Sequence, residues 1–152
     1  MTAAPRSGPQ RKADTLARLQ EVGADTWVAT ATPSGVAHLV PLSYAWVGQQ
    51  VALAVLADSL TLRNLVASGR ARLGFGPTRD VVLMDVELAG ELDVAEASED
   101  VAGAYARQSG WDPRAERDAY RFLLLRPVRV QAWREANELA GKLLMREGAW
   151  LF

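Results

Sequence analysis

The stretch Thr26–Ala57, "TWVATATPSGVAHLVPLSYAWVGQQVALAVLA", decides the fold. Its β-branched and aromatic residues alternate with small ones, and the turn-forming sequences PSG and GQQ interrupt the run twice. This pattern predicts a three-stranded meander over Thr26–Thr32, Val36–Val47 and Val51–Ala57. Pro41 falls inside the second strand. Because proline has no N–H to give to a ladder, it predicts an edge, a bulge or a bend at that point.

On the C-terminal side, the sequence predicts helices over 60–68 and 99–110 and strands over 71–76, 79–97 and 119–135. Gly69 is suited to ending the first helix, and Ser98 to capping the second. The two longer strands are expected to bend, one at Gly90 and the other at Pro127. The pattern is therefore rich in strands and poor in helices.

The two ends of the chain differ in character. The first 12 residues, MTAAPRSGPQRK, are polar and rich in Pro and Gly, which predicts a disordered arm over 1–12 and not a signal peptide. Residues 13–23 predict a short amphipathic helix with Asp14 as its N-cap. No internal repeat is present, so 13–152 are expected to form a single domain. Its apolar tail over 136–152 is expected to contact a second copy of the chain.

The composition excludes several classes of function. Hydrophobic residues make up 49% of the 152 residues, enough for one domain with a sizeable core. The net charge of -1 indicates no nucleic-acid or membrane-surface partner, and no apolar run is long enough to span a bilayer. The absence of cysteine excludes disulfides and thiolate sites, and with His38 as the single histidine no transition-metal site is expected. A cytoplasmic protein fits best, although a secreted one would also suit a chain without cysteine.

Several antiparallel strands with few helices predict a mainly β (α+β) fold in which the sheet closes, wholly or in part, into a barrel. The apolar tail and the tryptophans at the predicted strand ends indicate that part of the core is shared with a second copy. A two-fold symmetric homodimer is the commonest way to bury such surface.

The sequence DSLTLRN, Asp58–Asn64, raises a question of function at the start of the helix over 60–68. The first N–H groups of a helix lack intrahelical partners and attract anions. Ser59 occupies the N-cap position, and hydroxyl, guanidinium and amide donors follow at Thr61, Arg63 and Asn64. Arginine suits phosphate because its planar fork binds two oxygens. Two interpretations remain at this point: a plain cap, which is the commoner case, or an anion site.

The order of four segments resembles the pyridoxamine 5′-phosphate oxidase-like superfamily of FMN-binding split β-barrels, which includes flavin and deazaflavin oxidoreductases. These segments are TWVATATPSGVAHLVPLSYAW, LADSLTLRNLVASGRARLGFG, TRDVVLMDVELAGEL and YRFLLLRPVRVQAW. The similarity runs from about Asp14 to the tail. It implies a Greek-key-like split barrel and a homodimer with two sites at its interface, each binding FMN or coenzyme F-420.

The resemblance also implies which residues bind the cofactor. The phosphate would lie beside Ser59, Thr61, Arg63 and Asn64. The ring would lie along the second strand, facing the backbone of Val40, Pro41, Leu42 and Ser43. Arg79 or Asp80 would approach the cofactor, and Trp133 with Arg134 would close the site from the partner chain. Local ion pairing for Arg79 and Asp80, and core or dimer packing for Trp133, are the alternatives.

This chain departs from its apparent relatives in two ways. Many relatives carry a lysine in the first turns of the helix, whereas here Arg63 would have to supply that charge. No convincing set of pyridoxamine phosphate ligands is present, so true pyridoxamine phosphate oxidase activity is not expected. The implied reaction is hydride transfer between the reduced ring and a small unsaturated or aromatic substrate. The alternatives are a non-catalytic carrier or sensor of flavin, haem or tetrapyrrole, and a barrel without ligand.

Other polar residues allow two interpretations each. His38 is either a proton donor beside the ring or a strand histidine facing solvent or hydrogen-bonded in the barrel wall. The carboxylates at 85, 87 and 91 repeat every second residue, which is typical of a solvated strand face and not of an acid–base pair. Arg70 and Arg72 line a groove for the anionic tail of F-420 or are ordinary surface charges.

Overall fold

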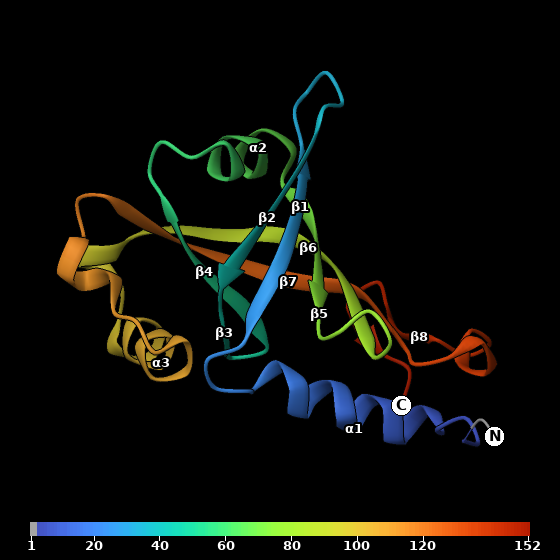
Figure 1. Ribbon diagram of the computed structural model, residues 1–152. Helices are drawn as coiled ribbons and strands as arrows, with labels where there is room; N and C mark the ends of the chain where they lie inside the picture. The colour runs from blue at the N-terminus through green and yellow to red at the C-terminus, as the bar shows by residue number, and fades with distance from the viewer. Residues whose placement is uncertain (1–2) are drawn as a thin grey trace.

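The computed structural model describes residues 3–152, so that Met1 and Thr2 of the expected arm lie outside the described residues. Nine strands form one antiparallel sheet in the order β2-β1-β5-β6-β7-β4-β3, with β8 added to β7 and β9 to β8 (Figure 1). The strands are β1 (Asp25–Ala31), β2 (Ala37–Ser43), β3 (Ala45–Val47), β4 (Gln50–Leu56), β5 (Arg70–Phe75), β6 (Val81–Asp93), β7 (Tyr120–Trp133), β8 (Leu143–Arg146) and β9 (Ala149–Trp150). The α-helices are α1 (Gly8–Leu19), α2 (Leu60–Ser68) and α3 (Glu99–Ser109).

The three predicted strands form, but as two hairpins and not as a meander, because the second strand divides at Tyr44 into β2 and β3. Tyr44 is buried, its ring meets that of Phe75 edge-on at 5.0 Å, and its hydroxyl donates to the carbonyl of Arg18 at 3.1 Å. β2 pairs with β1, with Pro41 opposite Trp27, whereas β3 pairs with β4. Within residues 3–152, β2 has β1 as its one neighbour. The edge position predicted from Pro41 is therefore confirmed.

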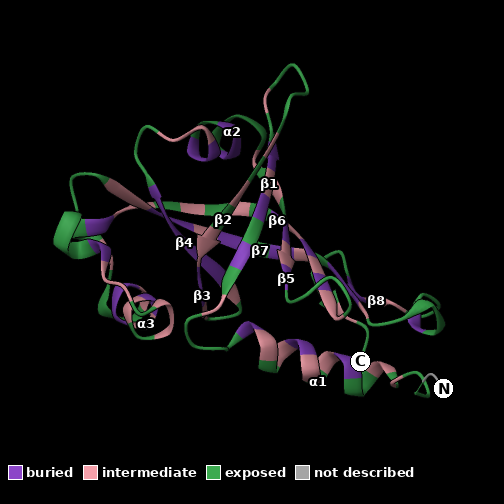
Figure 2. Cartoon of the chain, viewed as in Figure 1, coloured by how far each residue is buried: buried purple, intermediate pink, exposed green. Residues whose placement is uncertain are grey.

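The helix α2 has the predicted bounds because both of its ends carry local signals. Ser59 Oγ accepts a hydrogen bond from Leu62 N at 3.2 Å, and Gly69 adopts the left-handed conformation at φ 72°. Its buried side chains lie on one stripe that faces the sheet, and the helix lies across one end of the barrel (Figure 2). Burying this stripe fixes where the opening of α2 lies relative to the strands.

The long strands β6 and β7 carry the predicted irregularities. Their pairing shifts register between Leu88 and Gly90, and again where Pro127 faces Val86. The extra residue at each shift bends the strands and increases their twist. These bends allow the two strands to curl around the core, most of which is one apolar cluster inside the barrel.

The N-terminal prediction was wrong in two respects. α1 begins at Gly8 with Ser7 as its N-cap, and Asp14 lies inside the helix. The last residues of the expected disordered arm are consequently helical. The helix start is fixed locally, since Ser7 Oγ accepts from Gln10 N at 3.2 Å. The helix is also tied to the tail, because the buried guanidinium of Arg11 donates to the carbonyl of Glu138 at 3.0 Å. No local pattern reveals such contacts.

The apolar tail adds two strands that the sequence did not predict. β8 pairs with β7, and its Leu144 and Met145 are buried in the barrel core of the same chain. Leu151 and Phe152 remain about half exposed, at 45% and 50%. Part of the tail therefore completes its own core. The expectation that the tail contacts a second copy now rests on its last residues.

Candidate functional site

The opening of α2 holds two of the four predicted phosphate ligands at the surface. Ser59 is half-buried and caps the helix, while Arg63 is exposed. The guanidinium of Arg63 folds back toward the opening and donates to the carbonyl of Asp58. Because Ser59 already accepts from the N–H of Leu62, the N–H groups of Leu60 and Thr61 are those of the first turn without an intrahelical partner, and the guanidinium of Arg63 lies at the same place.

The other two predicted ligands, Thr61 and Asn64, lie beneath the helix. Asn64 is 2% exposed, and its Nδ2 donates to Thr30 Oγ1 at 3.0 Å. Thr61 is 3% exposed, and its Oγ1 lies 3.2 Å from His38 Nε2. Their polar atoms join α2 to β1 and β2. The structure therefore does not bring all four side chains together at the helix opening.

The same contacts place β2 beside the first turn of α2. His38 is half-buried in the barrel wall and hydrogen-bonded, which matches the second of its two interpretations. Further along β2, Val40 and Leu42 are half-buried against the core, and Pro41 is exposed. Ser43 is already engaged, because its hydroxyl donates to Asp25 at 3.4 Å. The free edge of β2 therefore runs from the helix opening along the predicted ring-binding segment.

Arg79 and Trp133 come together elsewhere, beside the turn between β5 and β6. With Arg134 and neighbouring residues they line a groove of about 400 Å³. Arg79 is largely exposed and lies 3.5 Å from Glu135, while the ammonium of Lys142 sits 4.9 Å above the ring of Trp133. This turn and α2 lie at opposite ends of the barrel (Figure 1). Within one protomer, Arg79 and Trp133 therefore lie far from the opening of α2.

Asp80 belongs to an ion network and not to an open site. Its carboxylate lies 2.8 Å from the guanidinium of Arg18 and 3.3 Å from that of Arg134. The same network includes Glu138, which accepts from the backbone N, Nε and Nη2 of Arg6 at 2.9, 3.0 and 2.8 Å. The hydrogen bonds from Arg6 hold the pKa of Glu138 down at about 2. Sequence analysis missed this network because its members lie in distant segments: the arm, α1, the turn between β5 and β6, and the segment after β7.

The acidic residues of β6 pair across the sheet. Glu87 lies against Arg126, and Glu91 accepts from Arg121 at 2.7 Å. Asp85 accepts two hydrogen bonds from Arg72, at 2.5 and 3.1 Å. These rows of opposite charge stabilise the strand pairing, so the carboxylates are not free for acid–base chemistry.

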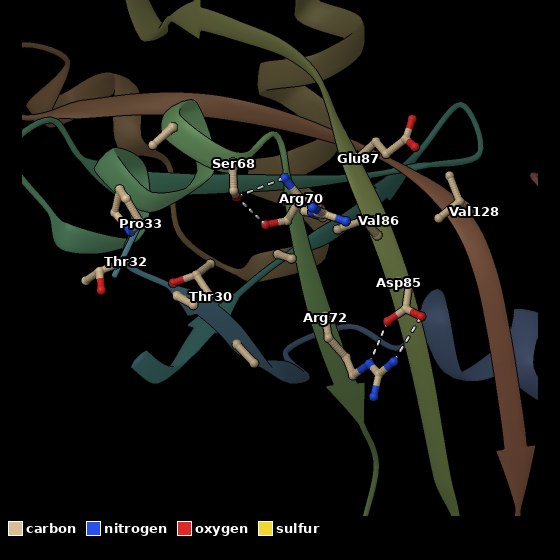
Figure 3. Close-up of a pocket in the computed structure, with 14 residues that line it drawn as sticks. Thr30, Thr32, Pro33, Ser68, Arg70, Arg72, Asp85, Val86, Glu87 and Val128 are labelled. Atoms are coloured by element: carbon tan, nitrogen blue, oxygen red, sulfur yellow. Dashed lines mark hydrogen bonds and ion pairs between the residues drawn. The ribbon is translucent and has the colours of Figure 1, made fainter. Parts of the chain in front are cut away.

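A further groove, of about 760 Å³, contains none of the predicted cofactor residues. It lies at the C-terminal end of α2, between the end of β1 and the strands β5 and β6 (Figure 3). Arg70 and Arg72, noted in the sequence as charges that could line a groove, both lie in it. This groove is therefore separate from the opening of α2.

Residues 3–152 contain neither a cluster of metal-ligating side chains nor a membrane-spanning helix. No three His, Asp or Glu side chains in this part of the chain are grouped so that they could hold a metal ion. No described helix has the length and apolar character needed to cross a membrane.

The fold is that of the split β-barrel proteins, as predicted. An F420 reductase shares it with a TM-score of 0.61 and 15% identity, over 74% of this chain and 92% of that one. A haem-binding protein from Mycobacterium smegmatis gives 0.59 and 16%, over 90% of this chain and 57% of that one. A putative 5-nitroimidazole antibiotic resistance protein from Bacteroides thetaiotaomicron gives 0.61 and 9%, over 78% and 81%.

At these identities the likeness establishes the mainly antiparallel α+β fold alone. No family model matches the chain, and no curated protein matches it. What the protein binds therefore has to be argued from its own residues.

Proposed function

We propose that this protein binds FMN or coenzyme F-420 and is an oxidoreductase acting on a small unsaturated or aromatic substrate. The observation that carries this proposal is the opening of α2 beside the free edge of β2. There the helix N–H groups and the exposed Arg63 lie next to unpaired strand backbone, and the contact between His38 and Thr61 holds the two elements together. A phosphate joined to a flat polar ring needs both features.

Different residues of this site bind different parts of the cofactor. The helix N–H groups and Arg63 bind the phosphate, since both favour an anion. The backbone of Val40–Ser43 hydrogen-bonds the ring along the edge strand. Thr61 and Asn64 support the site from below by fixing α2 on the barrel. When bound, the ring supplies the hydride chemistry, and the protein supplies orientation and exclusion of water.

The proposal includes a homodimer, because one chain does not bring all the predicted residues together. A second copy would bring its Arg79 and Trp133 to the ring bound by the first. The large hydrophobic side chains of Trp27 and Leu39, 53% and 60% exposed on the outer face of β1 and β2, provide apolar surface for such a contact. Contiguous apolar surface of this kind marks association sites.

The single histidine argues against haem as the ligand. Haem iron takes an axial ligand such as histidine. His38 is half-buried, and its Nε2 is engaged with Thr61 beneath α2. Binding haem through His38 would break this contact. A phosphate at the helix opening needs only the exposed guanidinium of Arg63 to turn away from the carbonyl of Asp58.

The test is to titrate the purified protein separately with FMN, F-420 and haemin while following tryptophan fluorescence. One of the first two should bind at micromolar concentration or below. Arg63→Ala should weaken that binding about tenfold or more, because a charge-assisted contact is lost. Arg117→Ala, which removes an exposed arginine without an ion pair in residues 3–152, is the control. Equal affinities for Arg63→Ala and wild type would refute the phosphate site.

A second measurement separates an enzyme from a carrier or sensor. The cofactor that binds is reduced, and its oxidation is followed with and without small unsaturated or aromatic acceptors. An oxidoreductase speeds oxidation with at least one acceptor. If the protein accelerates none of them while holding the cofactor tightly, the carrier assignment replaces the enzymatic one.

A further inference from the structure

The groove at the C-terminal end of α2 has the size of a ligand site. Its volume of about 760 Å³ falls within the range of small-molecule pockets. Segments from β1, α2, β5 and β6 line it, and Figure 3 shows their side chains around the start of β5. Because α2 has nine residues, this groove lies about 13 Å from the helix opening at 1.5 Å per residue. It is therefore a separate feature from the proposed cofactor site.

One positive charge in this groove has no partner. Arg72 is paired with Asp85 through two hydrogen bonds, as Figure 3 shows. Glu87, directly opposite Arg70 in the strand register, is paired with Arg126 on its other side. The guanidinium of Arg70 makes no hydrogen bond or ion pair within residues 3–152. The groove thus presents a single uncommitted cation.

The hydroxyl groups of the groove are already engaged. Thr30 Oγ1 accepts from Asn64, and Thr32 Oγ1 accepts from Val36 N at 3.0 Å. Ser68 Oγ donates to the carbonyl of Asn64 at 2.9 Å. The remaining lining is short and apolar, contributed mainly by four alanines: Ala29, Ala31, Ala67 and Ala71. A ligand here meets an apolar surface, the guanidinium of Arg70, and the paired carboxylates of Asp85 and Glu87.

We infer that this groove is a second binding site, which takes an organic anion with a flat apolar body. The anionic group, a carboxylate or a phosphate monoester, binds the free guanidinium of Arg70. Its apolar body covers the alanines and leaves the two neighbouring ion pairs intact. The inference does not depend on the proposed cofactor, because it uses the opposite end of α2. It does require that the proposed dimer contact at Trp27 and Leu39 leave Ala29, the neighbour of Leu39 across the strands, uncovered.

The test uses three probes with the same ring system: 2-naphthoate, 2-naphthyl phosphate and the uncharged 2-naphthamide. Each is titrated into ¹⁵N-labelled protein, and the amide shifts are mapped by NMR. The two anions should shift the amides of 29–33 and 67–72, with dissociation constants at least tenfold lower than that of the amide. The stronger of the two anions identifies carboxylate or phosphate as the natural group.

Variants then locate the interaction. Arg70→Gln should weaken anion binding about tenfold, whereas Arg117→Gln, at an exposed arginine outside both sites, should leave it unchanged. Ala31→Leu, which fills part of the floor, should weaken all three probes. Equal binding of the anions and the amide overturns the proposal, and so do equal losses in the two arginine variants. Absence of shifts in 29–33 and 67–72 also overturns it, as would occur if a second copy covered the groove.

Discussion

Asn64 shows how a predicted ligand can instead hold the fold together. Its amide is buried and donates to Thr30 Oγ1. Asn64→Ala should lower the free energy of unfolding by about 1–3 kcal/mol, because the change removes a buried hydrogen bond and leaves a small cavity. Urea denaturation measures this loss, and Arg63→Ala on the exposed face should stay within about 0.5 kcal/mol of wild type.

The same variant distinguishes support from direct contact. If Asn64 acts only beneath the helix, cofactor affinity per folded molecule should fall less in Asn64→Ala than in Arg63→Ala. A larger loss of cofactor affinity in Asn64→Ala than in Arg63→Ala would show that Asn64 contacts the cofactor directly. The sequence contained the relevant signal, since residues three and four apart share a helix face. Thr61, Asn64 and Leu65 follow that spacing, and Arg63 lies on the other side.

Glu138 gives the protein an acid-sensitive contact. Its folded pKa of about 2 lies below the ordinary value of 4.5, so its ionised form stabilises the folded state above pH 4.5. That stability is lost as the pH falls from 4.5 toward 2, and the difference corresponds to about 3 kcal/mol. Unfolding followed across this range should be less pH-dependent in Glu138→Gln. Glu116→Gln, at an exposed carboxylate, should keep the wild-type profile.

At the scale of elements, the turn between β5 and β6 is tightly constrained. Gly76 has φ 79°, and a Cβ there would lie 2.7 Å from the carbonyl oxygen of Asp80 and would also collide with Arg18 Nη1. Gly76→Ala therefore combines backbone strain with a collision against main chain and should destabilise by about 2 kcal/mol. It should also displace Arg79, the residue proposed to reach the partner's cofactor.

Gly35, in the turn between β1 and β2, is the matched control for this change. Its φ is 88°, but nothing lies within 4 Å of a Cβ built there. Gly35→Ala should show the conformational cost alone, about 1 kcal/mol. Thermal unfolding of both variants compares them directly. Equal losses would mean that the close approach to Asp80 has no energetic consequence.

The elements also show which local signals were sufficient. α2 was predicted with both of its bounds because Ser59 and Gly69 act within one turn of the helix. The start of α1 was misjudged because Ser7 and Pro9, a helix cap and a first-turn proline, were interpreted as signs of disorder. β8 was misjudged because its pairing with β7 joins distant parts of the chain. Local propensity contains no record of such partners. The same holds for the candidate site. The opening of α2 could be predicted from its local cap, whereas the position of Arg79 and Trp133 relative to that opening could not.

At the scale of the whole molecule, the dimer is the proposal on which the complete site depends. The chain of 16.5 kDa should sediment as a species of about twice that mass. Leu39→Glu places a charge on the exposed outer face of β2 and should dissociate the dimer and weaken cofactor binding together. Val22→Glu, at another exposed apolar residue, is the control. A monomer that binds the cofactor with full affinity would contradict a shared site.

Pro41 has one more consequence for a protein that leaves a strand edge open. A free edge is a template on which any extended chain can add a strand, and such growth leads to aggregates. Proline at this position removes one N–H from β2 and so interrupts the row of hydrogen bonds that an incoming strand would need. The edge along which we propose that the ring binds is thereby a poor seed for amyloid-like assembly. Pro41 allows this edge to stay unpaired without becoming a template for further strands.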